Sequence, residues 1–394
     1  MAELQTKENN HRIGSIDAAR GLVMIVMALD HVRDFMHVTS LTQDPTNLQT
    51  TTAALFLTRW VTHLCAPTFV FLSGVSAYLF YNSSPDSSRK KFLFNRGLWL
   101  MFIDLTVINF ALWFDVQLHT VIMEVVFAIG FGLMVISLLL KLPARAIGLA
   151  GILIIFSHNL FQGLTFKNNP TLDFIFAVFF RQSLFTPKPG FAFITAYPLL
   201  PWLGVILTGF GFGELFKLPE PVRKKRFLQI AAGVFCLFVL IRGLNFYGDP
   251  LPWSVQKNSL FTFLSFINVT KYPPSLLFIL LMLSVLFIVL WLLEGKNNPL
   301  IKVLRVYGKV PLFYFIVHLY LIHLLTLLMV FVEGHTFADL KFGLLRNGRP
   351  EGTGVELGTV YLIWIAVVLF LFPVCKWYGK YKQKHKSNRI LQYL

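Results

Sequence analysis

The chain alternates long apolar runs with short polar segments. The runs are about 20 residues long, which is the length an α-helix needs to cross about 30 Å of hydrocarbon. They do not alternate apolar and polar residues at every second position, as the strands of a membrane barrel would. The pattern predicts ten membrane-spanning helices, at residues 14–36, 53–80, 92–114, 119–140, 143–162, 195–217, 226–246, 274–293, 310–332 and 356–377.

Two further apolar segments, 172–185 and 258–269, are short for a span. They fit re-entrant or interfacial helices, although one crossing segment would raise the count to eleven. The expected fold class is an all-α, polytopic membrane helix bundle. One transmembrane domain, residues 13–378, is expected between a polar tail at 1–12 and a basic tail at 379–394.

The composition supports a membrane protein. Hydrophobic residues make up 56% of the chain and charged residues 14%, whereas a soluble domain averages about 25% charged residues. The net charge of +16 lies in short clusters beside apolar spans. This placement favours an anionic membrane surface over nucleic acid as the partner. The three cysteines lie inside apolar runs, so we expect small buried residues and no disulfide.

Basic residues also predict the orientation. Lys and Arg cluster in both tails and in every second loop, and the intervening loops are poorer for their length. Under the positive-inside rule both termini and the basic loops face the cytoplasm. Ten spans fit this alternation, so 172–185 is expected not to cross. The polar N-terminus lacks the layout of a signal peptide, and the first span is therefore expected to be retained.

The first span carries ionisable residues that an apolar helix would normally exclude. At 100° per residue one helical face carries Asp17, Arg20, Met24, Met27, His31 and Asp34. Burying such groups costs about 2.5–3.5 kcal/mol each on insertion scales. This face must therefore point into the bundle or a wet cavity. A structural alternative is that Asp17 and Arg20 only pair near the inner interface.

Two other spans carry histidines at compatible depths. Arg59 and His63 share a face of the second span, and Pro67 removes a backbone hydrogen bond there and frees the carbonyl of His63. In the ninth span Tyr314 and His318 share a face, and His318 is favoured over the neighbouring His323 as the functional residue. Imidazole can take and give a proton near neutral pH. A buried structural role remains the alternative for each. No HxH or HExxH pair is present, so no metal is expected.

Three motifs resemble a known family. They are DAARG at the start of the first span, THLCAPTFVFLSG in the second, and the G-x-x-P-L-x-Y-x-x-x-H pattern that ends at His318. They are similar to bacterial members of the heparan-α-glucosaminide N-acetyltransferase-like family, formerly a domain of unknown function. The Arg20-x10-His31 spacing also resembles the signature of the integral-membrane acyltransferase-3 proteins. The lysosomal relative differs, with Asn and Asp in place of His31 and His63 and with a histidine whose nearest candidate here is His37.

The resemblance implies a membrane acyltransferase of the bacterial inner membrane. It would move an acyl group from cytoplasmic acyl-CoA, such as acetyl-CoA, to a hydroxyl or amine of a sugar or envelope glycan on the outer side. The alternative is a proton-coupled transporter or flippase that uses the same buried groups. A homodimer is left open. Candidate roles are acid–base catalysis for His31, Asp30, Asp34, His63 and His318; acyl-CoA binding for Arg12, Arg20, Arg96 and Lys309; and substrate or oxyanion contacts for Arg33, Arg59 and Tyr314.

Overall fold

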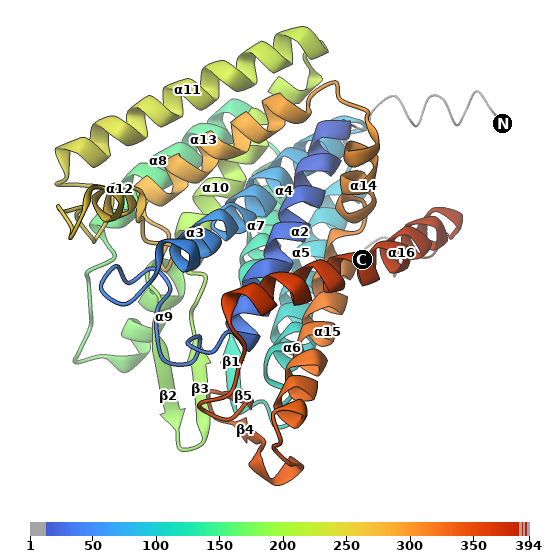
Figure 1. Ribbon diagram of the computed structural model, residues 1–394. Coiled ribbons are helices and arrows are strands. Elements are labelled where there is room, and N and C mark those ends of the chain that lie inside the picture. The colour runs from blue at the N-terminus through green and yellow to red at the C-terminus, as the bar shows by residue number, and fades with distance from the viewer. Residues whose placement is uncertain (1–12, 386–387, 389–390, 392–394) are drawn as a thin grey trace.

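The computed structural model describes residues 13–385, 388 and 391, which form a helical bundle with short strands gathered at one end (Figure 1). We call this the hairpin end. The opposite end, where the first described helix begins, is called the basic end. The predicted fold class, an all-α membrane helix bundle, is confirmed.

The described helices and strands follow one another along the chain. In order, they are α2 (Gly14–Met36), α3 (Ala53–Thr62), α4 (Cys65–Asn82), α5 (Ser87–Ile103), α6 (Asn109–Trp113), β1 (Thr120–Ile122), α7 (Val125–Leu139), α8 (Ala144–Ser157), α9 (Pro170–Phe180), β2 (Leu184–Lys188), β3 (Phe191–Ile194), α10 (Leu199–Gly211), α11 (Glu220–Leu244), α12 (Ser259–Ile267), α13 (Leu276–Leu293), α14 (Pro299–Gly308), α15 (Pro311–Val332), β4 (Lys341–Gly343), β5 (Arg346–Gly348) and α16 (Leu357–Lys384).

Within the described residues, seven helical segments are long and apolar enough to cross a membrane. They correspond to seven of the ten predicted spans. The other three are α2, which has 23 residues but carries several charges, and α7 and α8, which have 15 and 14 residues. Length and composition therefore establish a multi-pass membrane protein, and the count of ten stays a prediction.

The two short apolar segments form short helices. α9 has 11 residues and α12 has 9. At a rise of 1.5 Å per residue they measure about 16 and 14 Å. This is about half of the hydrocarbon thickness, so neither helix is long enough to cross.

The prediction of a helix from residue 119 is wrong at its start. Thr120–Ile122 forms strand β1, which pairs in parallel with β3, and the helix begins at Val125. β-branched residues fit a pleated strand well. The hydrophobic pattern also does not predict α14. Its 10 residues include Lys302 and Arg305 and are too few for a span.

Two of the long spans are interrupted. The helix of the second span stops at Thr62 and resumes at Cys65, with His63 and Leu64 in the break. Pro67 has no N–H to bond the carbonyl of His63, which explains the break there. Between α5 and α6, residues Asp104–Ile108 form a π-helical turn. Such turns occur often at functional sites.

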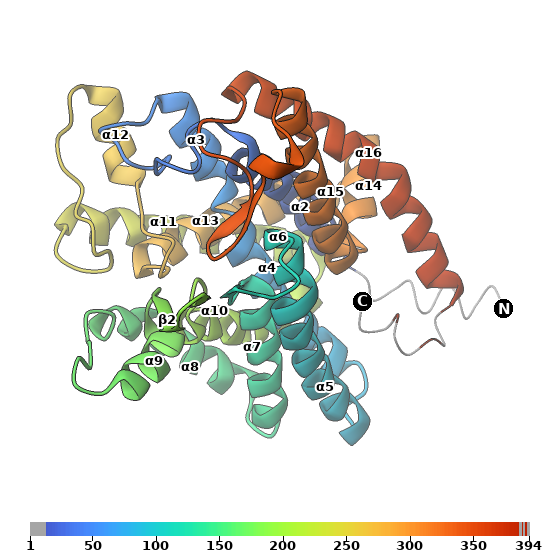
Figure 2. The same ribbon diagram turned by 90° about the horizontal axis from the view of Figure 1, so that it is seen from below.

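α2 lies inside the bundle, in contact with α3, α4, α13, α14, α15 and α16 (Figure 2). Its closest neighbour is α14. A Cβ atom on Gly21 would lie 1.8 Å from the carbonyl oxygen of Leu304, and one on Gly308 would lie 1.8 Å from that of Asp17. Each glycine precedes a histidine by ten residues, Gly21 before His31 and Gly308 before His318. His318 lies in α15, which begins three residues after Gly308, so the close glycine contact fixes how α2 meets the start of the helix that carries His318.

Candidate active site

The central feature of the site is a pair of histidines from α2 and α15. His31 Nδ1 lies 2.7 Å from His318 Nε2, and the two rings are stacked with their centroids 4.9 Å apart. His318 Nδ1 lies 2.9 Å from the backbone oxygen of Tyr314. His318 is fully buried, whereas His31 is only partly buried.

These contacts fix which nitrogen atoms carry protons when both rings are neutral. A carbonyl oxygen can only accept, so Nδ1 of His318 must donate to Tyr314. Nε2 of His318 then has a lone pair and accepts from Nδ1–H of His31. The remaining nitrogen of His31, Nε2, therefore carries a lone pair. A neighbour that fixes the tautomer in this way is what a general base needs.

The acidic residues beside His31 are bound to cations. Asp30 Oδ1 accepts from Arg33 at 2.8 Å, and Arg59 lies 2.6 and 2.5 Å from its two oxygens. Asp34 pairs with Arg33 at 2.7 Å. Asp30 and Asp34 are the nearest acidic neighbours of His31 in the sequence, but it is His318 that contacts a ring nitrogen of His31. Successive residues point 100° apart on a helix, which turns Asp30 away from its neighbour's ring and towards α3.

His31 lies in the wall of a cavity of about 240 Å³, which we call the central cavity. The apolar part of its wall includes Phe69 of α4 and Phe315 of α15. Its polar lining residues are Asp30, His31, Asp34, Glu124, Tyr197, Lys271, Tyr272 and Asn347. The central cavity therefore combines a base with carboxylates, a cation and hydroxyl groups.

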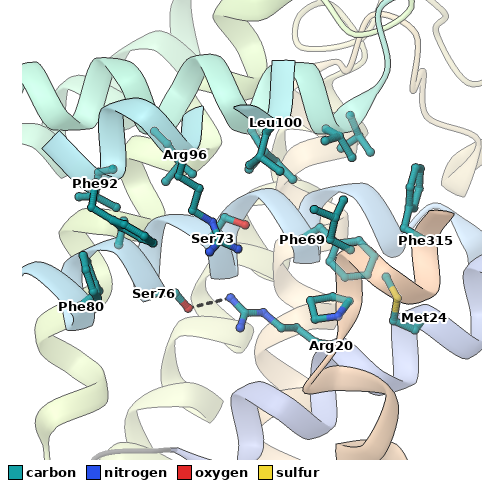
Figure 3. Close-up of a pocket in the computed structure, with 18 residues that line it drawn as sticks. Arg20, Met24, Phe69, Ser73, Ser76, Phe80, Phe92, Arg96, Leu100 and Phe315 are labelled. Carbon is teal, nitrogen blue, oxygen red and sulfur yellow. Dashed lines mark hydrogen bonds between the residues drawn. The ribbon is translucent and has the colours of Figure 1, made fainter. Parts of the chain in front are cut away.

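A second cavity, the inner cavity, lies towards the basic end and has a volume of about 280 Å³. Arg20 and Arg96 both line it (Figure 3). Arg20 donates to the backbone oxygen of Leu72 at 2.9 Å and to Ser76 Oγ at 2.7 Å. The rest of the wall is mainly aromatic and aliphatic. Phe69, Val125 and Phe315 line both the inner and the central cavity, so the two are separated by the thickness of these side chains.

A third cavity, the outer cavity, has a volume of about 670 Å³. Lys271 and Tyr272 line both it and the central cavity. Polar residues from the loops make up much of its wall, and Arg59 and His63 lie at its α3 side. The three cavities therefore form a series through the bundle, with His31 in the middle one.

The remaining predicted residues lie at different distances from the histidine pair. His63 lines the outer cavity, and its Nδ1 is buried without a hydrogen-bond partner in the described part of the chain. Tyr314 stacks behind His318, with ring centroids 5.0 Å apart, and lines none of the three cavities. Arg33 is buried and does not line them either. Lys309 is exposed at the end of α14. Arg12 lies outside the described residues.

Sequence reasoning missed Lys271. Its side chain is 7% exposed and its Nζ lies 3.9 Å from Asp30 Oδ2 and 4.9 Å from the centre of the Tyr272 ring. The sequence carries one signal for it: Lys271 directly precedes the Tyr-Pro-Pro motif at 272–274, in a loop with few basic residues. Glu124, which stands out only as a lone acidic residue in an apolar stretch, also lines the central cavity.

Metal ligands are not grouped in the described part of the chain. Across residues 13–385, 388 and 391, no cluster of three or more His, Cys, Asp and Glu side chains could hold a metal ion. The chemistry that these residues offer is proton transfer by imidazole, with nearby cations to stabilise negative charge.

Comparisons with known proteins identify the family of the chain. A family model described as "Heparan-alpha-glucosaminide N-acetyltransferase, catalytic" matches residues 12–247. A comparison with curated proteins finds no significant match. The matched range is more than half of the chain and includes His31, Arg59, Arg96 and Glu124. The chain therefore belongs to the heparan-α-glucosaminide N-acetyltransferase-like family, whose description indicates a membrane acetyltransferase.

Proposed function

We propose that this protein moves an acyl group, in the first instance acetyl, from acyl-CoA to a hydroxyl or amine of a sugar or envelope glycan. Acyl-CoA would enter at the basic end, which faces the cytoplasm if the positive-inside rule holds. The acceptor would enter at the hairpin end. The observation that supports this proposal most directly is the His31–His318 pair in a cavity that lies between an arginine-lined and a polar cavity.

The inner cavity suits the donor. Arginine binds phosphate groups through several parallel N–H donors, and Arg20 and Arg96 line this cavity together. Its apolar walls suit the thin pantetheine arm of CoA. Because Phe69, Val125 and Phe315 line both this cavity and the central cavity, small movements of these side chains would let the thioester reach His31.

The reaction then needs one base. His31 Nε2 takes the proton from the acceptor O–H or N–H group while the acceptor oxygen or nitrogen bonds to the thioester carbon. The C–S bond of the tetrahedral intermediate breaks next. The CoA sulfur leaves and receives the proton from His31, so that the free thiol and the acylated acceptor are the products. His318 keeps its hydrogen bond to His31 throughout and stabilises the imidazolium that forms between these steps.

Negative charge on the thioester oxygen needs a cation or a hydrogen-bond donor near it. Lys271 is the best-placed cation, because it lines the central cavity and the outer cavity. Arg59 is held by Asp30 at 2.5 Å and supplies positive potential from the side of the outer cavity. The polar outer cavity, at about 670 Å³, has room for several sugar rings.

The test uses purified protein in nanodiscs with labelled acetyl-CoA and periplasmic or membrane glycans. Wild-type protein should bind acetyl-CoA and transfer the label. His31→Ala should bind acetyl-CoA normally and lose transfer by at least about 10²-fold. His335→Ala is the matched control, because this histidine lies in a loop, paired with Asp339 at 3.9 Å. Full transfer by His31→Ala would remove His31 from the mechanism.

The competing function is a proton-coupled transporter or flippase, since buried His, Asp and Arg residues also form proton relays. Liposomes that contain the protein distinguish the two functions. If acetyl-CoA is neither bound, hydrolysed nor consumed in transfer, and if a substrate drives proton flux across the liposome membrane, the acyltransferase proposal is overturned.

A further inference from the structure

Glu124 occupies an unusual place in the central cavity. It lies directly before α7, and its side chain does not cap that helix. It lines the central cavity together with His31. The other two carboxylates of this cavity, Asp30 and Asp34, are both paired with Arg33. Among the described residues, no Lys or Arg lies within ion-pair distance of Glu124.

The backbone next to Glu124 is held by two fully buried polar residues. Asp104 Oδ2 accepts from the N–H of Glu124 at 3.0 Å. Asn109 binds Ile122 twice: its Oδ1 accepts from the N–H at 2.7 Å and its Nδ2 donates to the oxygen at 2.9 Å. On the other side, Met123 N–H donates to the oxygen of Ile194 at 2.9 Å. Three consecutive residues, 122–124, are therefore fixed by bonds to α6, the π-helical turn and β3.

The π-helical turn brings together Asp104 and Asn109, the two residues that hold this backbone. Asp104 and Asn109 stand at its start and just after its end, and Asn109 Nδ2 also donates to the backbone oxygen of Asp104 at 2.7 Å. Both residues are fully buried. Burying a polar group is costly unless it is hydrogen-bonded. The fold therefore uses two buried polar side chains and an irregular helical turn to hold one short junction, and the side chain that this junction presents to the cavity is Glu124.

We propose that Glu124 is a catalytic residue that binds the acceptor and orients it for attack. Its carboxylate accepts a hydrogen bond from the group next to the nucleophile, or from the second N–H when the nucleophile is an amine. It keeps this bond while His31 takes the proton that is lost, so that Glu124 itself gains no proton in the reaction. This inference rests on the proposed function and adds to it a second contact between the protein and the acceptor.

The role follows from the chemistry of the cavity. A neutral His31 offers one lone pair, which removes a single proton but leaves the acceptor free to rotate. A second hydrogen-bond acceptor, at the start of a different helix, defines the direction of the nucleophile's lone pair, and correct orientation accounts for a large part of enzymatic rate enhancement. Asp30 and Asp34 are engaged by arginines, so Glu124 is the carboxylate best suited to this task in the described part of the cavity.

The experiment compares Glu124→Gln and Glu124→Ala with wild type in nanodiscs. Three quantities are measured: acetyl-CoA affinity, slow hydrolysis of acetyl-CoA by water, and transfer to the acceptor at varied acceptor concentration. We expect affinity and hydrolysis to stay within about twofold of wild type, because water needs no orientation by Glu124. Transfer kcat/KM for the acceptor should fall by about 10²-fold in Glu124→Ala and less in Glu124→Gln, which keeps one acceptor oxygen.

Glu351→Gln is the matched control, because this glutamate is exposed at the hairpin end and should leave all three quantities unchanged. Asp104→Asn adds a test of positioning: acceptor KM should rise while acetyl-CoA affinity stays constant. If wild type transfers acetyl groups and Glu124→Ala does so equally well, the role of Glu124 is refuted while the proposed function stands. If wild type itself neither binds nor uses acetyl-CoA, the proposed function fails and this inference fails with it.

Discussion

The glycine contact between α2 and α14 gives the sharpest mechanical prediction. Gly21→Ala would place a methyl group 1.8 Å from the carbonyl oxygen of Leu304, and Gly308→Ala would place one 1.8 Å from that of Asp17. Both obstacles are backbone atoms, which cannot rotate away as a flexible side chain can. Either substitution must therefore push the two segments apart.

The size of the displacement follows from the geometry. Ordinary contacts of this kind begin at 3.4 Å, so the segments must separate by about 1.6 Å, and such overpacking typically costs about 1–3 kcal/mol. If α2 moves as a rigid helix directly away from α15, the distance of 2.7 Å between His31 and His318 grows to about 4.3 Å at most, beyond hydrogen-bond range. His31 then loses the neighbour that fixes its tautomer. We expect transfer kcat to fall by at least about 10²-fold.

The assay combines thermal unfolding in detergent with transfer of labelled acetyl groups in nanodiscs. Gly233→Ala in α11 is the control, since no atom lies within 4 Å of the position of its new Cβ, and alanine in place of glycine favours a helix by about 1 kcal/mol. This control should unfold at the same or a higher temperature and keep its activity. Wild-type unfolding and activity in Gly21→Ala would show that the glycine contact does not set the register of the histidines.

Three other substitutions test separate parts of the structure. His318→Phe keeps a ring but removes the acceptor, so transfer should fall by about 10²-fold while titration with acetyl-CoA shows unchanged affinity; equal activity would mean that the pair is only structural. Asp30→Asn leaves Arg59 without its carboxylate and Arg33 with Asp34 alone, and thermal unfolding should show a loss of about 3–5 kcal/mol in unfolding free energy; an unchanged unfolding temperature would contradict these ion pairs. Arg349→Met removes the donor to the backbone oxygens of Phe35 and His37, both at 3.0 Å, and should speed hydrogen exchange in residues 349–355, with exchange elsewhere in the chain as the control.

Hydrophobic pattern was sufficient to predict most long helices, because each needs only its own run of apolar residues. It failed where pairing with a distant segment decides the structure. Thr120–Ile122 is apolar enough to extend the following helix. It forms a strand instead, because it pairs with β3, which lies more than 65 residues later in the sequence. Likewise α14 is a short amphipathic helix that packs against α2 through the glycine contact, and no local pattern shows that contact.

For the site, sequence periodicity and family resemblance together predicted His31, His318, Arg20 and Arg96, and the structure places these residues in the histidine pair and in the wall of the inner cavity. They did not identify the partner of each group. Asp30 and Asp34 are the nearest acidic neighbours of His31 along the chain, but a helix directs adjacent side chains apart. Lys271 reaches the cavity from a loop, where periodicity says nothing about direction. Its position depends on the packing of a segment 240 residues away from His31 in the sequence.

The central position of α2 has a consequence for how the protein is made. α2 is the first of these helices to leave the ribosome, but four of its six neighbours, α13 to α16, begin only at Leu276. During most of synthesis the charged face of α2 therefore lies in the membrane before most of the helices that enclose it have been made. The pairs of Arg33 with Asp30 and Asp34 lie within α2 itself and are available from the start to neutralise that face. Insertion should thus be the stage at which this helix is most vulnerable to loss of Arg33, long before any substrate is present.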